Sequence, residues 1–296
     1  MKVSRGLLAS LSLVYFVAFA GTTFANDRVT IIYDAFGDNP KLTRDWGFSA
    51  LVEHVGKRIL FDTGNNAETF AHNVRALGID LGKLDCVVIS HRHTDHSTGL
   101  KYVLSVNPQV SVYAPKESFT QFGGDLPRTF LRPVSELPSK MRYFDGNYPQ
   151  SIPAGRLYDG GNFILIDSQT EIFPGIFVVP TISNTAGTLE LHELTLAIKG
   201  PAGLTLIDGC SHAGVEEILH AASSIDTRFR ILFGGLHLVT KPQDEIDRLV
   251  DNLKTKWKIE RIAPGHCTGE AAFLRLQKAF AANYIYAGVG TQIEVP

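Results

Sequence analysis

Three histidines and an aspartate are concentrated in the segment His91–His96, which reads His-Arg-His-Thr-Asp-His and follows an apolar run. Imidazole nitrogens bind zinc, iron and other divalent metals, and a carboxylate adds charge and a harder oxygen ligand. The spacing therefore predicts ligands for one metal ion or for two adjacent ions. A solvated polar turn is the alternative. Four potential ligands in six positions, directly after an apolar strand, favour the metal site.

The elements on either side of this cluster determine how its side chains point. Cys86–Ile89 is short and rich in β-branched residues, which predicts a buried strand. The apolar spacing after Gly99 predicts a helix at about 97–106. In an extended turn between the two, His91 and His93 point the same way, because alternate side chains share a face. Asp95 and His96 then fall where the chain bends back.

Further ligands must come from elsewhere in the chain, which has ten histidines. His212, His237 and His266 each follow a predicted strand and a glycine. Ligands delivered from several strand ends by tight glycine turns would converge on one rim. We predict His212 and His266 as ligands, with a polar residue in a tight turn as the alternative. His237 is predicted to orient a ligand or to contact substrate, and His192 is either a ligand or a loop residue.

Acidic and sulfur-containing side chains accompany these histidines. Asp62 ends a predicted strand and would hold a ligand histidine by hydrogen bonding. Asp208 and Cys210 are possible ligands themselves. Cys210 and Cys267 could instead form a disulfide in an oxidising compartment, although three cysteines are too few for a disulfide scaffold. Cys86, inside a strand, is predicted to be a small core residue.

The composition is that of an ordinary globular protein. The chain has 296 residues, of which 44% are hydrophobic and 20% charged, enough for one large domain or two small ones. The net charge of −2 does not provide the excess of positive charge that binds nucleic acid. We therefore expect a small molecule rather than a nucleic acid as the partner.

The first 25 residues resemble a secretory signal peptide. Lys2 and Arg5 precede an apolar run at 7–20, and Thr23-Phe24-Ala25 offers a small-x-Ala cleavage site. The apolar run is below the ~20 residues needed to span a bilayer, so no stable membrane anchor is expected. The sequence thus predicts a periplasmic or secreted protein, with residues 1–25 removed and residues 26–296 forming the functional domain.

Predicted strands and helices alternate in two runs along this domain. The first run has strands at 29–33, 48–54, 58–61, 86–89 and 110–114 and helices at 66–77 and 97–106. The second has strands at 163–166, 172–173, 176–179, 194–198, 204–207, 230–233 and 261–263 and helices at 215–222, 243–257 and 270–280. Two such runs favour an αββα layout over a single parallel sheet.

Residues 116–160 separate the two runs and lack a regular pattern. They contain several prolines and scattered aromatic residues, which is typical of a lid or a substrate-binding wall. A plain surface excursion whose aromatic side chains pack underneath is the alternative, and the sequence leaves both open.

Several of these motifs match one known family. Phe61-Asp62-Thr63-Gly64 followed by the His91–His96 motif resembles the metallo-β-lactamase-fold superfamily. The segments 209–214, 234–238 and 264–269 are similar to one branch of it, which holds metal-dependent hydrolases and dihydropterin-ribofuranosylaminobenzene-phosphate synthases. The resemblance covers about 28–290. It implies an α+β fold, a four-layer αββα sandwich with the metal ions at one edge, usually two zinc ions or other divalent ions.

The resemblance also implies roles for single residues. His91 and His93 would hold the first metal, Asp95, His96 and His266 the second, and His212 is carried over as the remaining histidine ligand. One difference from the motif usual in the superfamily affects the first metal site. The Gly-His-Thr-Pro-Gly turn usual in hydrolases of the superfamily is replaced by Asn184-Thr185-Ala186-Gly187-Thr188. Completion of that site therefore stays open between His212, Cys210 and His192.

These inferences predict three functions. The first is a secreted metal-dependent hydrolase that attacks an ester, lactone, amide or phosphoester with a metal-activated water, Asp95 orienting that water or accepting its proton. The second is a transferase acting on a pterin-like phosphorylated substrate, against which the predicted export argues. The third is a non-catalytic metal- or ligand-binding protein.

Overall fold

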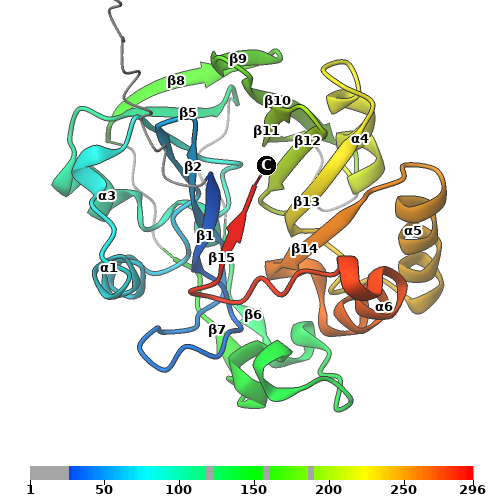
Figure 1. The fold of residues 1–296 in the computed structure, drawn as a ribbon. Helices are drawn as coiled ribbons and strands as arrows, with labels where there is room; N and C mark the ends of the chain where they lie inside the picture. Colours follow the sequence, from blue (N-terminus) through cyan, green and yellow to red (C-terminus); the bar gives the residue numbers. More distant parts are fainter. Residues whose placement is uncertain (1–26, 118–122, 156–159, 186–189, 296) are drawn as a thin grey trace, which may run out of the picture.

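Two β-sheets pack face to face, and helices cover both outer surfaces (Figure 1). The computed structural model describes residues 27–117, 123–155, 160–185 and 190–295. The predicted signal peptide lies outside the described residues. This arrangement confirms the predicted αββα sandwich.

The first sheet has seven strands in the order β15-β1-β2-β3-β4-β5-β8. They are β1 (Arg28–Tyr33), β2 (Ser49–His54), β3 (Lys57–Phe61), β4 (Cys86–Val88), β5 (Ser111–Pro115), β8 (Asn162–Ile166) and β15 (Gln292–Glu294). Strands β1 to β3 are antiparallel neighbours, whereas β3, β4, β5 and β8 run parallel. The helices α1 (Ala67–Ala76) and α3 (Leu100–Val106) cover the outer face through Phe70, Val74 and Val103.

The second sheet has six strands in the order β14-β13-β12-β11-β10-β9. They are β9 (Thr170–Phe173), β10 (Ile176–Ser183), β11 (Leu191–Gly200), β12 (Gly203–Asp208), β13 (Phe229–Gly235) and β14 (Arg261–Gly265). The helices α4 (Val215–Ala222), α5 (Gln243–Thr255) and α6 (Glu270–Phe280) lie on the outer face. Because β12, β13 and β14 are parallel, their carboxyl ends meet at the same edge of the sheet.

Side chains alternate between the two faces along each strand, and this alternation explains how the layers are held together. On β11, Leu194, Leu196 and Ile198 belong to the core between the sheets, whereas Ala197 faces the helices on the other side. Strands that are buried on both faces are apolar at nearly every position. The inner core is therefore continuous between the sheets, and the polar site residues are confined to the strand ends.

The segment 116–160 contains only short elements in its described part. These are β6 (Leu126–Pro127), β7 (Ser151–Ile152) and the 3-10 helices η2 (Arg128–Leu131), η3 (Ser139–Met141) and η4 (Tyr143–Gly146). Tyr143, Met141 and Leu131 are buried in a cluster that also holds Trp46 and Phe273. The aromatic residues at 119, 122 and 158 lie outside the described residues.

Outside the segment 116–160, one predicted helix is divided in two and one strand was not predicted. The predicted helix at 97–106 is two helices, and the first, α2 (Thr94–Ser97), begins inside the histidine cluster. Strand β15 was not predicted, because its three residues are held by pairing with β1 rather than by a pattern of their own. Among the described residues, no helix combines the length and the apolar character that crossing a bilayer requires.

Candidate metal centre

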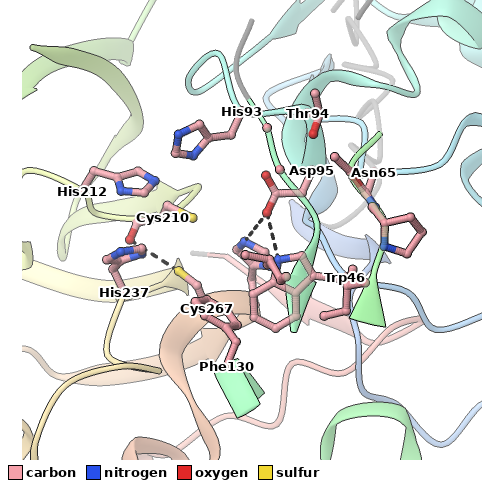
Figure 2. Close-up of a pocket in the computed structure, with 17 residues that line it drawn as sticks. Trp46, Asn65, His93, Thr94, Asp95, Phe130, Cys210, His212, His237 and Cys267 are labelled. Atoms are coloured by element: carbon pink, nitrogen blue, oxygen red, sulfur yellow. Dashed lines mark hydrogen bonds and ion pairs between the residues drawn. The ribbon is translucent and has the colours of Figure 1, made fainter. Parts of the chain in front are cut away.

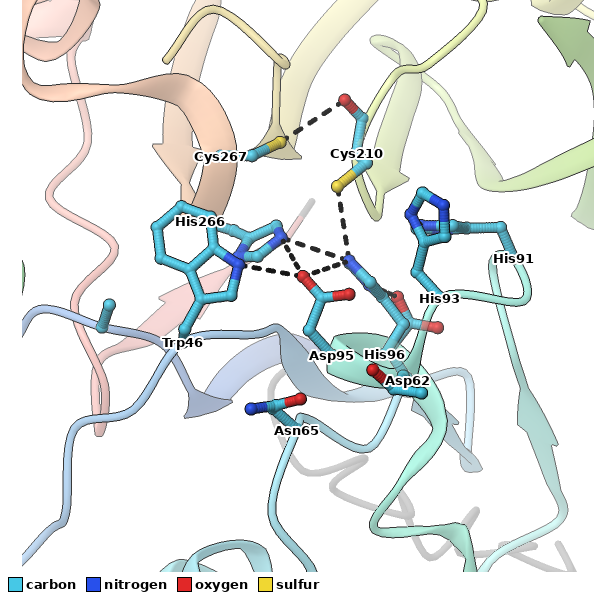
Figure 3. Close-up of polar contacts among 12 residues, drawn as sticks. Trp46, Asp62, Asn65, His91, His93, Asp95, His96, Cys210, His266 and Cys267 are labelled. Carbon is cyan, nitrogen blue, oxygen red and sulfur yellow. Dashed lines mark hydrogen bonds and ion pairs between the residues drawn. The ribbon is translucent and has the colours of Figure 1, made fainter. Parts of the chain in front are cut away.

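The site lies at one edge of the sandwich, where segments from both sheets meet. His91 follows β4, His93 precedes the first turn of α2, and Asp95 and His96 lie within that turn. From the other sheet, residues after β12, β13 and β14 reach the same place (Figures 2 and 3). The chain thus delivers potential ligands from four separate turns.

His91, His93 and His212 form the first group of potential ligands, with one nitrogen from each within 4.8 Å of the others. His91 Nε2 lies 3.1 Å from His93 Nδ1, and the ring of His212 lies 4.8 Å from that of His91. Both ring nitrogens of His212 are buried and have no hydrogen-bond partner among the described residues. A buried imidazole without a partner is costly. Three converging imidazoles of this kind fit a divalent metal ion.

Asp95, His96 and His266 form the second group, again within 4.8 Å of one another. His266 Nε2 lies 3.2 Å from His96 Nε2 and 3.4 Å from Asp95 Oδ2 (Figure 3). The Nδ1 atom of His266 is also buried without a partner among the described residues. One carboxylate oxygen and two imidazoles again suit a divalent ion.

Buried carboxylates hold the second group in position. Asp62 accepts hydrogen bonds of 2.7 Å from the Ser90 amide, the Ser90 hydroxyl and His96 Nδ1. His96 therefore presents the lone pair of Nε2 to the site. Asp34, which the sequence analysis did not identify, accepts a hydrogen bond of 2.8 Å from the backbone N–H of His266. Its position directly after β1 is a signal that could have found it.

Glu193 is the second residue that the sequence analysis missed. Its carboxylate is fully buried and accepts hydrogen bonds from the backbone N–H groups of Cys210 (2.9 Å), Ser211 (3.1 Å) and His212 (2.7 Å). These bonds fix the turn that carries His212. An acidic residue in an otherwise apolar strand was the available signal. The adjacent His192 belongs to none of the groups of potential ligands among the described residues, and neither does Asp208.

Trp46 is the third residue that the sequence did not indicate, and it contacts both Asp95 and His266. Its indole N–H donates to Asp95 Oδ2 at 3.0 Å, and its ring lies 4.7 Å from that of His266. The indole is almost fully buried, so this hydrogen bond is shielded from water. Trp46 thus orients the carboxylate of Asp95.

We expect Trp46→Phe to lower metal affinity or kcat/KM by about 10- to 100-fold, the usual effect of removing a group that orients a ligand. The aromatic ring remains, whereas the N–H donor to Asp95 is lost. Metal content after dialysis and steady-state kinetics measure the effect. Trp257→Phe, at a tryptophan that hydrogen-bonds Glu216, is the control. Wild-type metal content and kinetics in Trp46→Phe would contradict the positioning role.

Strained backbone is concentrated in the turns of the site. Asp62, Ser211, His237 and His266 have φ angles of 56°, 60°, 49° and 43°, in the left-handed region that residues other than glycine rarely adopt. Gly209 is required for another reason, since a Cβ there would lie 2.3 Å from Ser90 Oγ. Packing around the site therefore holds these turns in backbone conformations that are locally unfavourable.

The three cysteines are free thiols. Cys210 and Cys267 do not form the disulfide that the sequence left open; instead the Cys267 thiol lies 3.5 Å from the carbonyl oxygen of Cys210. Cys210 Sγ lies 3.3 Å from His96 Nε2 and forms a further group of potential ligands with His91 and His96. Cys86 is buried in the core between the sheets.

Burial sets the protonation of the histidines. It lowers the pKa of His91 and His212 well below 6.5 and that of His93 to about 4. These imidazoles are therefore neutral at pH 7 and can donate a lone pair to a metal. Burial also disfavours the charged form of His266, but Cys267 and the carboxylates of Asp95 and Asp34 outweigh it and raise its pKa to about 9. A metal bound there must displace this proton.

These shifts predict that His91, His93 and His212 together destabilise the chelated, metal-free protein as the pH falls from about 6.5 to about 4. The unfolded chain protonates its histidines near pH 6.5, whereas folded His93 resists protonation down to about 4. His91 and His212 add to the loss, since their pKa values are lowered too. The stabilisation from His266 is complete below pH 6.5 and disappears only as the pH rises to about 9. Because the raised pKa of buried carboxyl groups such as Asp34 acts in the opposite direction, the contribution is measured as the difference in Tm between wild type and His93→Ala at pH 7 and at pH 5. A difference that does not shift in favour of His93→Ala at pH 5 would contradict it.

A cavity of about 210 Å³ opens onto both groups (Figure 2). His93, Asp95, His212 and His266 line its floor. The segment 116–160 supplies much of the wall, namely Gly123, Gly124, Leu126, Phe130, Ile152, Pro153 and Ala154. This segment therefore lines the pocket and also packs aromatic side chains into the core beneath it.

Comparison with known proteins identifies the family. Residues 42–266 match the model of the metallo-beta-lactamase superfamily, which is more than half of the chain. The chain belongs to this superfamily. The resemblance seen in the sequence motifs is thereby confirmed. Members of the superfamily typically bind divalent metals, and the histidine groups described above can hold them.

Three relatives of this superfamily member match over most of their length. A 7,8-dihydropterin-6-methyl-4-(beta-D-ribofuranosyl)-aminobenzene-5'-phosphate synthase of Methanocaldococcus jannaschii is 26% identical, covering 88% of this chain and 94% of the synthase. An uncharacterised protein of the same organism is 30% identical, with 84% and 93% covered. The crystal structure of a metal-dependent hydrolase of the beta-lactamase superfamily superposes with a TM-score of 0.66 at 28% identity, covering 91% of this chain and 99% of the hydrolase.

Proposed function

We propose that this protein is a metal-dependent hydrolase with two divalent ions, zinc being the expected metal. The observation that carries the proposal is the pair of adjacent ligand groups at the floor of one pocket. His91, His93 and His212 would hold the first ion, and Asp95, His96 and His266 the second. Such ions lower the pKa of bound water from 15.7 toward ~7 and polarise the oxygen of a carbonyl or phosphoryl group.

Other residues of the chain position the attacking water, a ligand histidine and the substrate. Asp95, held through Oδ2 by the Trp46 indole, orients the attacking water or accepts its proton. Asp62 keeps His96 in the tautomer that presents Nε2. The apolar wall from Leu126 and Phe130 binds the organic part of the substrate and excludes bulk water, and His237, which lines the same pocket, contacts the substrate or orients a ligand.

The size and lining of the pocket support the proposed class of substrate. A cavity of about 210 Å³ with an apolar wall suits a small ester, lactone, amide or phosphoester. The net charge of −2 does not favour a nucleic acid substrate. We propose from the signal-peptide pattern at 1–25 that the reaction takes place in the periplasm or outside the cell.

Metal analysis combined with a substrate screen tests the proposal. The purified protein is expected to hold about two divalent ions per chain and to hydrolyse at least one of an ester, lactone, phosphodiester or β-lactam panel. Activity should disappear on chelation and return with zinc. A protein that binds no stoichiometric metal, or whose turnover survives strong chelation, would exclude metal-assisted hydrolysis.

A transferase acting on a pterin-like phosphorylated substrate is the second candidate. The similarity to the synthase over 88% of this chain favours it. Phe130, which is half-buried and lines the pocket, offers an aromatic surface against which a flat heterocycle can pack. Quenching of pterin fluorescence on addition of the protein is the measurement. Pterin binding at micromolar concentration would support this candidate, whereas absence of quenching, or export of the protein to the periplasm, would count against it.

A further inference from the structure

Three neighbouring parallel strands end in a sulfur-rich cluster that the proposed hydrolytic centre does not use in full. In the register of the sheet, Asp208 of β12 pairs with Gly234 of β13, and Gly234 pairs with Pro264 of β14. Cys210, His237 and Cys267 follow these paired positions by two or three residues. The parallel arrangement therefore brings these three side chains together from distant parts of the sequence.

The ligand atoms of these three residues lie within 4.8 Å of one another. All three residues line the pocket, with the two sulfur atoms and the imidazole of His237 on the same side of it (Figure 2). The Nδ1 atom of His237 is buried and has no hydrogen-bond partner among the described residues. His237 and Cys267 belong to neither of the two groups assigned to the hydrolytic ions. The cluster is thus a further set of donors in the same cavity, and it borders the hydrolytic groups through Cys210, which also lies near His91 and His96.

The backbone is shaped to allow this close approach. A Cβ at Gly235 would lie 2.3 Å from the carbonyl oxygen of Gly209 and 2.7 Å from Cys267 Sγ. His237 itself has a φ of 49°, a conformation that costs free energy in a residue other than glycine. A glycine and a strained histidine are therefore both needed to set the imidazole beside the two thiols.

Two sulfur atoms and one imidazole form a ligand set that prefers soft metal ions. Thiolate ligands select Zn²⁺, Cu⁺ and other soft ions, whereas carboxylate and water suit Mg²⁺ or Ca²⁺. Around a tetrahedral ion of this type, with metal–sulfur bonds of about 2.3 Å, ligand atoms lie about 3.3–3.8 Å apart. Since the three ligand atoms lie within 4.8 Å of one another, each pair closes by at most about 1–1.5 Å to reach that spacing.

We propose that Cys210, His237 and Cys267 form a third cation site, which binds a thiophilic ion with two sulfurs and one nitrogen. The fourth position faces the pocket and is left to water or to a donor atom of a ligand. Binding requires both sulfurs as thiolates, and any proton that a thiol still carries passes to solvent. Cys210 also faces His96 at 3.3 Å, so an ion in the third site draws this sulfur away from the second group of ligands.

Cadmium titration of the full, zinc-loaded protein tests the third site. Cd²⁺ bound to thiolate gives a charge-transfer absorption in the ultraviolet, and the two hydrolytic groups contain no sulfur. We expect one Cd²⁺ per chain with this absorption in the wild type. Cys267→Ser should lose at least half of it and bind Cd²⁺ at least about 10-fold more weakly, while Cys86→Ala, in the core, should retain both.

The outcomes are distinguishable from those of the hydrolase test, because the absorption is read independently of turnover. Full thiolate absorption in Cys267→Ser would mean that Cys210 binds metal alone, and absence of absorption in the wild type would mean that no sulfur ligates; both overturn the third site. If Cys267→Ser does not fold, His237→Ala is the second variant. It keeps both sulfurs, and its affinity for Cd²⁺ must fall at least about 10-fold if the imidazole is a ligand.

Discussion

Replacing His93 with alanine is expected to lower kcat/KM by about 10³-fold or more. His93 lies in the first group of ligands, with Nδ1 only 3.1 Å from His91 Nε2, and it also lines the substrate pocket. Without it, two imidazoles remain, and a weakly held ion no longer lowers the pKa of water from 15.7 toward ~7. The variant should contain less metal at equal protein concentration. Metal analysis and steady-state kinetics on the same preparation measure both effects.

His72→Ala is the matched control for His93→Ala. His72 is an exposed histidine of α1 that contacts the carbonyl oxygen of Lys41 and lies outside all groups of potential ligands among the described residues. Its removal should leave metal content and turnover unchanged. If His93→Ala loses metal but keeps its function, the protein is not a hydrolase that depends on this ion. A non-catalytic binding role would then be the better description.

The grouping of potential ligands near the motif could be predicted because local geometry determines it. His91 and His93 alternate in an extended segment after β4, so they share a face, and the structure brings them into one group. His212 and His266 follow strand ends and glycine residues, and parallel strands bring such ends to a common edge. These relations depend on a few residues at a time, which is why the sequence is sufficient for them.

The partners that position the ligands depend on long-range packing, which the sequence alone does not specify. Along β11, successive side chains point to opposite sides, so His192 and its neighbour Glu193 cannot both face the site. From the sequence His192 was a possible ligand, whereas the carboxylate of Glu193 is the buried group that holds the turn of His212. Trp46 reaches Asp95 only because a loop between β1 and β2 folds over the edge. Such contacts follow from the packing of both sheets.

The largest effect on stability is expected for Glu193→Ala, by about 4 kcal/mol, or a fall in Tm of about 10 °C. The substitution removes the acceptor of three backbone N–H groups, those of Cys210, Ser211 and His212. Each buried donor left without a partner costs about 1–3 kcal/mol, and water entering the new cavity compensates only part of it. For a domain of this size, 1 kcal/mol shifts Tm by about 2–4 °C. Thermal and denaturant unfolding of the metal-free protein measure the loss.

Glu193→Gln separates the hydrogen bonds from the volume of the side chain. One carbonyl oxygen replaces Oε1 and can still accept from Cys210 and Ser211, but an amide NH₂ now faces the N–H of His212, which had donated to Oε2 at 2.7 Å. We expect this variant to lose about half as much stability as Glu193→Ala and to displace the turn of His212. Metal affinity should therefore fall by about 10- to 100-fold in both variants, in proportion to the disturbance of that turn. Glu136→Ala, at an exposed glutamate, should change neither quantity. Equal stability of Glu193→Ala and wild type would mean that water replaces the carboxylate at no cost, and the buried acid would then not be what positions His212.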